Sequence, residues 1–287
     1  MTKKNELHLH LISDSTGETV HQYARAGLAQ FPDTNITEHI WTLVRNKAHI
    51  DAIDRNLEKN PGIVLFSVVN KEVREMLEAL CTEKGVPNLS ILDPVVDLFS
   101  NILGTQRTQR VGGQHKLDTA YFRRMAAVEY AVVHDDGLNI ENLHDADMLL
   151  VGVSRTSKTP TSMYLGHRGF KVGNYALVPN VPFPIEKLPH KKLFIIGLTT
   201  DPKRLMQVRK TRLQHLSDST NSNYADIDII TNEVREARKL FNRHNWPVID
   251  VSRRSVEEIA ASIIHLHRKW LDQQELDQQE LDQQENV

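Results

Sequence analysis

Residues 152–160, GVSRTSKTP, combine the residue types that bind a nucleotide phosphate. A phosphate-binding loop needs a strand that delivers backbone N–H groups to one point, a lysine for the outer phosphate, and a Ser or Thr that holds Mg²⁺ at a helix start. The spacing from Gly152 to Lys158 and Thr159 matches the GxxxxGK(S/T) pattern, except that Ser157 stands at the second glycine position. Pro160 is compatible with a first helical turn, where its missing N–H needs no partner.

The stretch therefore predicts a phosphate loop. The expected nucleotide-binding set is Gly152, Val153, Ser154, Arg155, Thr156, Ser157, Lys158 and Thr159. In this interpretation the Lys158 ammonium meets the outer phosphate, and the Thr159 hydroxyl is the candidate Mg²⁺ ligand. The alternative is a polar strand-to-helix turn in which Ser154 or Thr156 caps the helix.

Two adjacent carboxylates, Asp135 and Asp136, lie shortly before this loop in the stretch HDDG. Adjacent acidic residues can hold Mg²⁺ or accept a hydroxyl proton during phosphoryl transfer. From the residues alone, either role is open to this pair. A turn that ends the preceding helix is the alternative.

A second anion site is predicted in SDSTGET, residues 13–19. Hydroxyl groups of Ser15, Thr16 and Thr19, together with Gly17, would surround the positive end of a helix, which favours a phosphate. The pattern is also typical of the loop with which flavodoxins hold a flavin phosphate, but aromatic residues make up only 6 % of the chain. A simple helix cap formed by Ser13 or Asp14 is the alternative.

The elements that must position these residues follow from alternating apolar runs and amphipathic stretches. Predicted strands are 7–13, 35–44, 62–69 and 88–92, then 147–152, 171–178, 193–198 and 246–251. Helical spacing of apolar residues predicts helices between them, the first marked by Val20, Ala24, Leu28 and Phe31. Strands separated by such helices favour parallel sheets. The predicted fold class is α/β, with two α/β units of mostly parallel sheets, the C-terminal one P-loop kinase-like.

The expected domain organisation follows the changes in composition. We predict an N-terminal α/β domain at 1–104, in which a flavodoxin-like strand order is one option, a basic linker at 105–118, a P-loop-type catalytic domain at 119–270, and a low-complexity tail at 271–287. In the second domain, the basic residues of 202–215 predict either a cationic lid or a solvated helix face; they are Lys203, Arg204, Arg209, Lys210 and Arg212.

The tail repeats LDQQE three times. A five-residue period rotates successive leucines by about 140° around a helix, so that Leu271, Leu276 and Leu281 share no face. We therefore expect a tail that frays or stays disordered and has no packing role.

Bulk composition excludes several functional classes. The net charge of −2 and the pI near 6.7 argue against nucleic acid as the partner. No stretch approaches the length of a membrane span, so no membrane partner is expected. One cysteine, Cys81, cannot form an internal disulfide, and the N-terminal residues contain no secretory apolar region. The sequence predicts a cytoplasmic protein with Cys81 as a small buried hydrophobe.

Four motifs in a fixed order carry a resemblance to a known family. They are ISDSTGET, AVEYAVVHDDG, GVSRTSKTPTSMYLGHRGFKVGNYALVP and GLTTDPKRL. With them, residues 5–270 resemble the bacterial pyruvate, phosphate dikinase regulatory protein family, and more closely than its sister group, which regulates phosphoenolpyruvate synthase. The order and spacing of four motifs are far more specific than any one of them.

The resemblance implies an unusual bifunctional enzyme. Members use ADP to phosphorylate a threonine near the catalytic histidine of the dikinase, which inactivates it, and they reverse this with inorganic phosphate, releasing pyrophosphate. The ADP-binding loop of the family corresponds to residues 152–159, and many relatives carry glycine where this chain has Ser157. For this chemistry Lys158 is expected to stabilise charge on the transferring β-phosphoryl group. Asp135 or Asp136 is then the candidate catalytic base, with His134 the weaker candidate. The N-terminal unit is expected to dock the target. A Mg²⁺ requirement and a homo-oligomer stay open.

Three rival functions are compatible with the same residues. The loop also fits a small-molecule P-loop kinase that uses ATP, and a sensor that binds a nucleotide without turnover. The N-terminal unit also fits a flavodoxin-like electron carrier. The phosphoryl donor, turnover and colour of the protein distinguish these alternatives.

Overall fold

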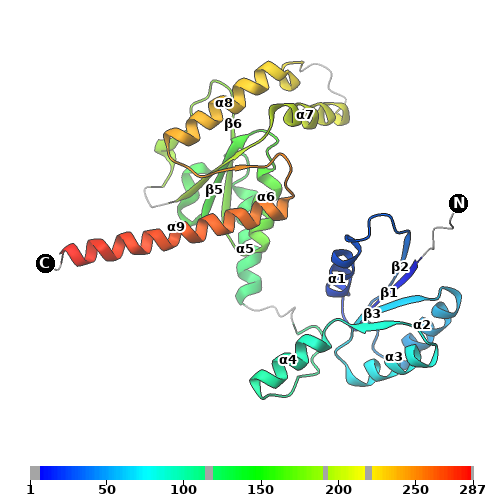
Figure 1. Ribbon diagram of the computed structural model, residues 1–287. Helices are drawn as coiled ribbons and strands as arrows, with labels where there is room; N and C mark the ends of the chain where they lie inside the picture. The colour runs from blue at the N-terminus through cyan, green and yellow to red at the C-terminus, as the bar shows by residue number, and fades with distance from the viewer. Residues whose placement is uncertain (1–6, 114–118, 190–192, 217–221, 286–287) are drawn as a thin grey trace. The chain divides into compact units, whose positions relative to one another are not determined.

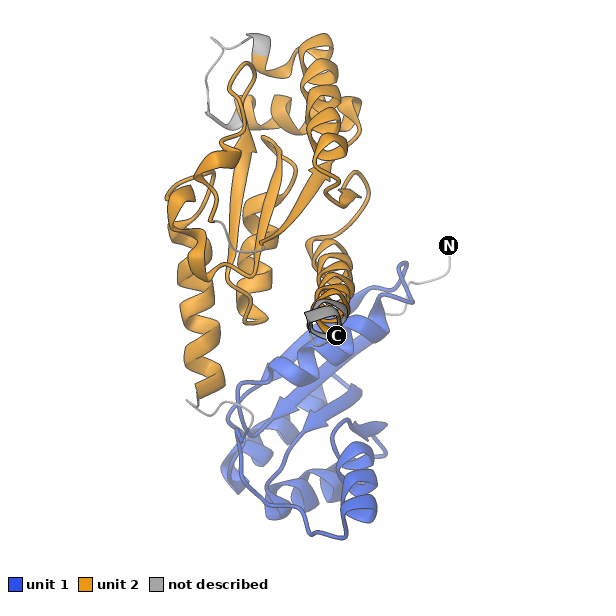
Figure 2. Ribbon diagram, turned by 90° about the vertical axis from the view of Figure 1, so that its left-hand side faces the viewer, with its two compact units in different colours: residues 1–116 blue, residues 117–287 orange. Residues whose placement is uncertain are grey.

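The computed structural model describes residues 7–113, 119–189, 193–216 and 222–285 (Figure 1). The chain divides into two compact units, residues 1–116 and residues 117–287, which Figure 2 colours separately. The predicted linker residue Lys116 lies outside the described residues.

Unit 1 contains a four-stranded sheet in the order β2-β1-β3-β4, with every pair parallel. Its elements are β1 (Leu7–Ser13), α1 (Glu18–Leu28), β2 (Ile36–Trp41), α2 (Lys47–Lys59), β3 (Gly62–Ser67), α3 (Lys71–Glu83), β4 (Asn88–Ser90) and α4 (Asp93–Leu103). Alternate residues of β1 face opposite ways: Leu9 and Leu11 pack with α1, whereas Ile12 packs with α2 and α3. Cys81 is buried in the second of these clusters, as the sequence predicts.

Unit 2 contains a second four-stranded parallel sheet, in the order β6-β5-β7-β8. The elements before and within the first half of the sheet are α5 (Thr119–Val133), the short helix η1 (Ile140–Asp145), β5 (Met148–Val153), α6 (Lys158–His167) and β6 (Val172–Leu177). The remaining elements are η2 (Ile185–Lys187), β7 (Phe194–Thr199), α7 (Pro202–Leu216), η3 (Ser222–Ala225), α8 (Ile227–Arg243), β8 (Val248–Asp250) and α9 (Val256–Glu285).

The two faces of this sheet are covered by different helices. On one face Leu149 and Val151 of β5 pack against Val234 and Phe241 of α8. On the other face, β5 and β7 pack against Leu165 of α6 and a set of α9 residues that includes Ile259. Every residue of β5 is buried, which is why the strand reads as a continuous apolar run and not as an alternating one.

The predicted α/β class with parallel sheets is confirmed, but two local predictions are wrong. Helix α1 ends at Leu28 and Phe31 is exposed, so Phe31 does not belong to the apolar stripe. The LDQQE tail, expected to fray or be disordered, instead continues α9 to Glu285. Leu, Gln and Glu are good helix formers, and a helix that already exists propagates easily through them. Leu271 and Leu276 are exposed, which agrees with the expectation that the repeat does not pack.

Within the described residues, none of the helices combines the length and the apolar character that crossing a bilayer requires.

Candidate functional site

The predicted phosphate loop lies between the end of β5 at Val153 and the start of α6 at Lys158. Arg155 and Ser157 both adopt left-handed backbone conformations, with φ of 72° and 58°. This region favours glycine, so the serine at the second glycine position of the motif adopts a conformation that suits glycine better. At Gly152 a Cβ would lie 2.6 Å from the Leu198 carbonyl oxygen and 2.8 Å from the Thr156 hydroxyl, so the first glycine is required by close packing.

The ammonium group of Lys158 points into the turn. The side chain is only 4 % exposed, and Nζ donates to the carbonyl oxygen of Val153 at 3.1 Å. The buried Thr156 hydroxyl donates to the same oxygen at 2.9 Å. Because Nζ carries three protons, it can hold this carbonyl and still donate to a phosphate oxygen.

Burial lowers the pKa of Lys158 from 10.5 to about 8, against the opposing effect of Asp136 and Asp135, which raise it. Desolvation disfavours the charged form of a lysine, and nearby carboxylates favour it. At pH 7 the side chain is therefore still protonated and carries a positive charge with little surrounding water. A positive charge in such surroundings attracts an anion more strongly than one in bulk water does.

Asp135 is held directly against the first turn of α6. Its Oδ1 accepts hydrogen bonds from the Thr159 hydroxyl at 2.8 Å and from Asn174 Nδ2 at 2.7 Å. Asn174 is buried in β6, and its Oδ1 accepts from the backbone N–H of Asp136 at 3.1 Å. A loop threonine beside an aspartate is the pair that holds Mg²⁺ in P-loop NTPases, so these residues fit that metal.

The other members of the HDDG stretch differ from Asp135. Asp136 is exposed, has a left-handed φ of 47°, and is the carboxylate free to meet a group arriving from solvent. His134 is buried, stacks on Tyr130 with ring centroids 3.9 Å apart, and shares a hydrogen bond of 2.9 Å with the Tyr130 carbonyl. His134 therefore serves packing.

The sequence predicts a shared role for Arg209 and four other basic residues of α7, but Arg209 is only 2 % exposed. Its guanidinium pairs with Glu233 of α8 at 2.6 Å and donates to the carbonyl oxygens of Ser154 at 3.3 Å and Tyr224 at 3.1 Å. It also lies over the Tyr224 ring, 4.6 Å from the centroid. Arg209 thus ties the first residue of the phosphate loop to α8. Lys203, Arg204, Lys210 and Arg212 are exposed, so the basic residues of α7 do not act as one group.

The tyrosine under this guanidinium also contacts the loop directly. The hydroxyls of Tyr224 and Ser154 are hydrogen-bonded at 3.3 Å, and Arg155 Nε donates to Tyr224 Oη at 3.4 Å. The turn between β5 and α6 is therefore braced from the α7 and α8 side as well as from the Asp135 side.

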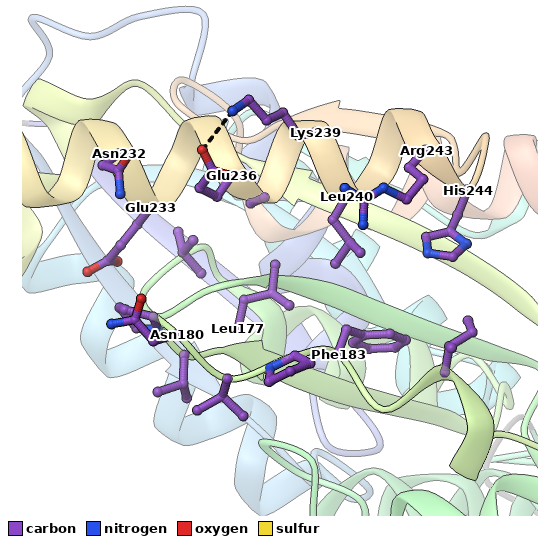
Figure 3. Close-up of a pocket in the computed structure, with 17 residues that line it drawn as sticks. Leu177, Asn180, Phe183, Asn232, Glu233, Glu236, Lys239, Leu240, Arg243 and His244 are labelled. Carbon is purple, nitrogen blue, oxygen red and sulfur yellow. Dashed lines mark hydrogen bonds and ion pairs between the residues drawn. The ribbon is translucent and has the colours of Figure 1, made fainter.

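A cavity of about 820 Å³ begins next to the loop, between α8 and the segment that follows β6 (Figure 3). Val153 and Glu233 lie at its loop end, and Arg243 and His244 lie along α8 beyond them. Leu240 and Phe183 contribute apolar surface, as Figure 3 shows. The sequence motifs did not indicate this cavity, because its walls come from segments about fifty residues apart that carry no recognisable pattern.

The predicted second anion site lies in unit 1, around the start of α1. A cavity of about 210 Å³ is lined by Ser15, Thr16, Gly17 and Thr19, together with Arg110. Gly17 caps α1 with a φ of 81° and without a side-chain hydrogen bond, so neither Ser13 nor Asp14 forms the simple cap considered as the alternative.

Both of those side chains bond elsewhere within unit 1. Asp14 Oδ2 accepts from the backbone N–H groups of Val69 at 2.7 Å and Asn70 at 2.9 Å. Ser13 Oγ accepts from Ser15 N at 3.2 Å. Among the predicted linker residues, Arg107 pairs with Asp93 and does not line this cavity.

No cluster of three or more His, Cys, Asp or Glu side chains in the described part of the chain is arranged to hold a metal ion. Any metal at the loop would therefore depend on the Thr159–Asp135 pair together with oxygens of a bound phosphate.

Comparison with known proteins adds independent information. The model of a protein family described as kinase/pyrophosphorylase matches residues 9–264. Several curated bacterial proteins that carry the name "Putative pyruvate, phosphate dikinase regulatory protein" are similar over nearly their whole length. One from Rhizorhabdus wittichii is 48 % identical over 260 residues, which is 91 % of this chain and 95 % of the relative. One from Paramagnetospirillum magneticum is 46 % identical over 273 residues, which is 95 % of this chain and 88 % of the relative.

Proposed function

The chain belongs to the kinase/pyrophosphorylase family, and from this premise we propose that it is a bifunctional regulator of pyruvate, phosphate dikinase. In one direction it transfers the β-phosphoryl group of ADP to a threonine of the dikinase and inactivates it. In the other direction it transfers that phosphoryl group to inorganic phosphate, releases pyrophosphate, and restores the dikinase. The names carried by the relatives support the dikinase as the target enzyme. The geometry of the loop supports phosphoryl transfer as the reaction.

The observation that carries the proposal is the buried ammonium of Lys158 at the start of α6, beside two carboxylates. In phosphoryl transfer most of the catalytic effect comes from positioning and from neutralising charge, so few groups take part in covalent chemistry. Lys158 and the backbone N–H groups of residues 154–158 would bind the β-phosphate. Because Lys158 lies in a low-dielectric location, its single positive charge attracts the phosphate strongly.

The forward reaction balances with these groups. The threonine oxygen of the target attacks the β-phosphorus of ADP, the bond between that phosphorus and the bridging oxygen breaks, and AMP leaves. The hydroxyl proton must go to a base. Asp136 is exposed and adjacent to the loop, so it is our candidate for that role. Asp135 accepts bonds from Thr159 and Asn174, and it therefore positions the loop.

The reverse reaction uses the same loop. An oxygen of inorganic phosphate attacks the phosphorus of phosphothreonine and gives its proton to Asp136. The bond between that phosphorus and the threonine oxygen breaks, pyrophosphate leaves, and Asp136 returns the proton to the threonine oxygen. Thr159 and Asp135 would hold Mg²⁺, which, when bound, neutralises charge on the phosphate oxygens. Unit 1, with the cavity at Ser15, Thr16 and Thr19, is proposed to dock the target enzyme.

The test mixes the chain with purified dikinase and ADP, then locates added phosphate by peptide mass. We expect phosphate on a threonine of the dikinase, loss of dikinase activity, and reversal by inorganic phosphate with release of pyrophosphate. Lys158→Met should abolish both directions, whereas Lys210→Met, a change of the same type at an exposed position of α7, should abolish neither.

Parallel reactions separate the rival functions. Transfer from ATP to a metabolite would replace the proposal with a small-molecule kinase. Transfer from ADP to phosphoenolpyruvate synthase in place of the dikinase would keep the chemistry and change the target. Binding of ADP with no transfer to either enzyme would reduce the protein to a sensor.

A further inference from the structure

The cavity between α8 and residues 177–185 has no role in the chemistry described so far. It measures about 820 Å³, within the range that small-molecule sites occupy. We propose that this cavity binds the nucleoside of ADP, its base and ribose, while the diphosphate reaches back to the loop. This inference rests on the proposed function, because it concerns the donor of that reaction.

The cavity and the loop share residues, so one ligand can occupy both. Val153 lines the cavity, and its carbonyl oxygen is the group that accepts from Lys158 Nζ. Glu233 also lines the cavity, and its partner Arg209 donates to the carbonyl of Ser154. A diphosphate bound at residues 154–158 would therefore place its α-phosphate, which carries the nucleoside, at the mouth of this cavity.

The walls of the cavity match the chemistry of a nucleoside. Leu177, Phe183 and Leu240 offer apolar surface that suits the faces of a base, as Figure 3 shows. The side-chain amides of Asn180 and Asn232 line the same cavity and can both donate and accept. An apolar site with a few polar groups that fix orientation is the usual construction of a cofactor pocket.

The placement also satisfies the geometry of transfer. The incoming oxygen and the leaving group lie on opposite sides of the transferring phosphorus, roughly in line. Asp135 and Thr159 belong to the side of the sheet that α6 covers, whereas the cavity belongs to the side that α8 covers. AMP leaving toward α8 would thus be opposite a hydroxyl arriving beside the HDDG carboxylates.

The two directions of the reaction give the test. Transfer from ADP needs the nucleoside site, but transfer from phosphothreonine to inorganic phosphate involves no nucleoside. Leu240→Trp would fill the cavity from α8, and Val181→Trp would fill it from the opposite wall, where Val181 is exposed enough to tolerate a larger side chain. Asn242→Trp is the control, because Asn242 is exposed on α8 and does not line the cavity.

We expect either filling variant to lose ADP-dependent phosphorylation by at least about tenfold, the scale of lost apolar contacts in a binding pocket, and to keep phosphate-dependent dephosphorylation. The control should keep both. Equal loss of both directions in folded variants would mean that the cavity docks the target protein and would overturn the inference. Full retention of both directions would overturn it as well.

Binding measurements keep this inference separate from the proposed function. Titration calorimetry with the full chain should give an ADP affinity that falls at least about tenfold in the filling variants, and a pyrophosphate affinity that stays within about twofold. This pattern would support the nucleoside site even if no protein target accepted a phosphoryl group. A parallel loss of ADP and pyrophosphate affinity, or no ADP binding by the unmodified protein, would refute it.

Discussion

Replacing Lys158 by methionine should stabilise unit 2 while it removes the proposed activity. Burial lowers the pKa of Lys158 from 10.5 to about 8, a difference of about 2.5. Each pKa unit corresponds to about 1.4 kcal/mol, so the charged ammonium costs the folded protein about 3 kcal/mol. Methionine has a similar length and no charge. The bond from Nζ to the Val153 carbonyl is lost, at a cost of about 1 kcal/mol, which leaves a net gain of about 2 kcal/mol.

The carboxylates near Lys158 do not reverse this result. Asp135 keeps its bonds from Thr159 and Asn174 in the variant, and Asp136 is exposed to solvent. For a unit of this size, a gain of about 2 kcal/mol raises the unfolding midpoint by roughly 4–8 °C. Thermal and urea unfolding at pH 7 would measure it. Lys210→Met should change stability by less than about 0.5 kcal/mol, because surface substitutions rarely do more.

The pH dependence of the difference identifies its cause. The pKa of Lys158 is lower in the folded protein than in the unfolded chain, so the unfolded chain binds the lysine proton more tightly. Where both states are protonated, the buried charge therefore lowers the free energy of unfolding by its full amount. The advantage of Lys158→Met should therefore be complete below about pH 8 and fade between pH 8 and pH 10.5. A variant that is less stable than the original protein at pH 7, or a gain that does not change with pH, would refute the assignment of a buried, desolvated ammonium.

Three further predictions concern other residues. Ser157→Gly should stabilise unit 2 by about 0.5–1 kcal/mol in urea unfolding. The left-handed conformation disfavours serine by more than the stability that glycine loses through its greater flexibility in the unfolded chain. A loss of stability would contradict this prediction. Glu233→Gln should destabilise unit 2 by about 3 kcal/mol in the same assay, because it leaves the buried Arg209 charge without its carboxylate partner. A change below about 1 kcal/mol would mean that this ion pair contributes little to stability. Burial lowers the pKa of both His10 and His39, so the stability of unit 1 should be highest above the unfolded pKa of about 6.5 and should fall as the pH drops below that value. Hydrogen exchange of the β1 amides would measure it, and the dependence should weaken in His10→Phe.

Much of the fold could be predicted because its signals are local. The run from Met148 to Val153 is apolar throughout and buried on both faces, which is typical of a central parallel strand. The spacing from Gly152 to Lys158 located the turn at the end of that strand, and the structure has the turn there. The binding role of the turn stays a prediction, as do the domain limits and the cytoplasmic location.

The residues that brace the loop could not be predicted, because their partners are distant in sequence. Asn174 lies in an apolar stretch, and the carboxylate it contacts is 39 positions away. Arg209 lies among similar basic residues of α7, and only its pairing with Glu233, 24 positions away, makes it different. A residue type and its neighbours do not report such contacts, which depend on how helices pack across a sheet.

Several unfavourable features of unit 2 occur together in the turn between β5 and α6, and this grouping is itself informative. Arg155 and Ser157 adopt left-handed backbone conformations, which cost residues with a side chain about 1–2 kcal/mol each. The next residue, Lys158, buries an ammonium group. Arg209 donates to the Ser154 carbonyl on one side of the turn, and Asp135 accepts from the Thr159 hydroxyl on the other, so the arrangement is held from both sides. Local strain of this kind persists where the surrounding structure over-determines it, which is typical of binding sites. An anion at the turn would meet the buried ammonium and raise its pKa. Phosphate or pyrophosphate should therefore stabilise unit 2, and it should stabilise the original protein more than Lys158→Met.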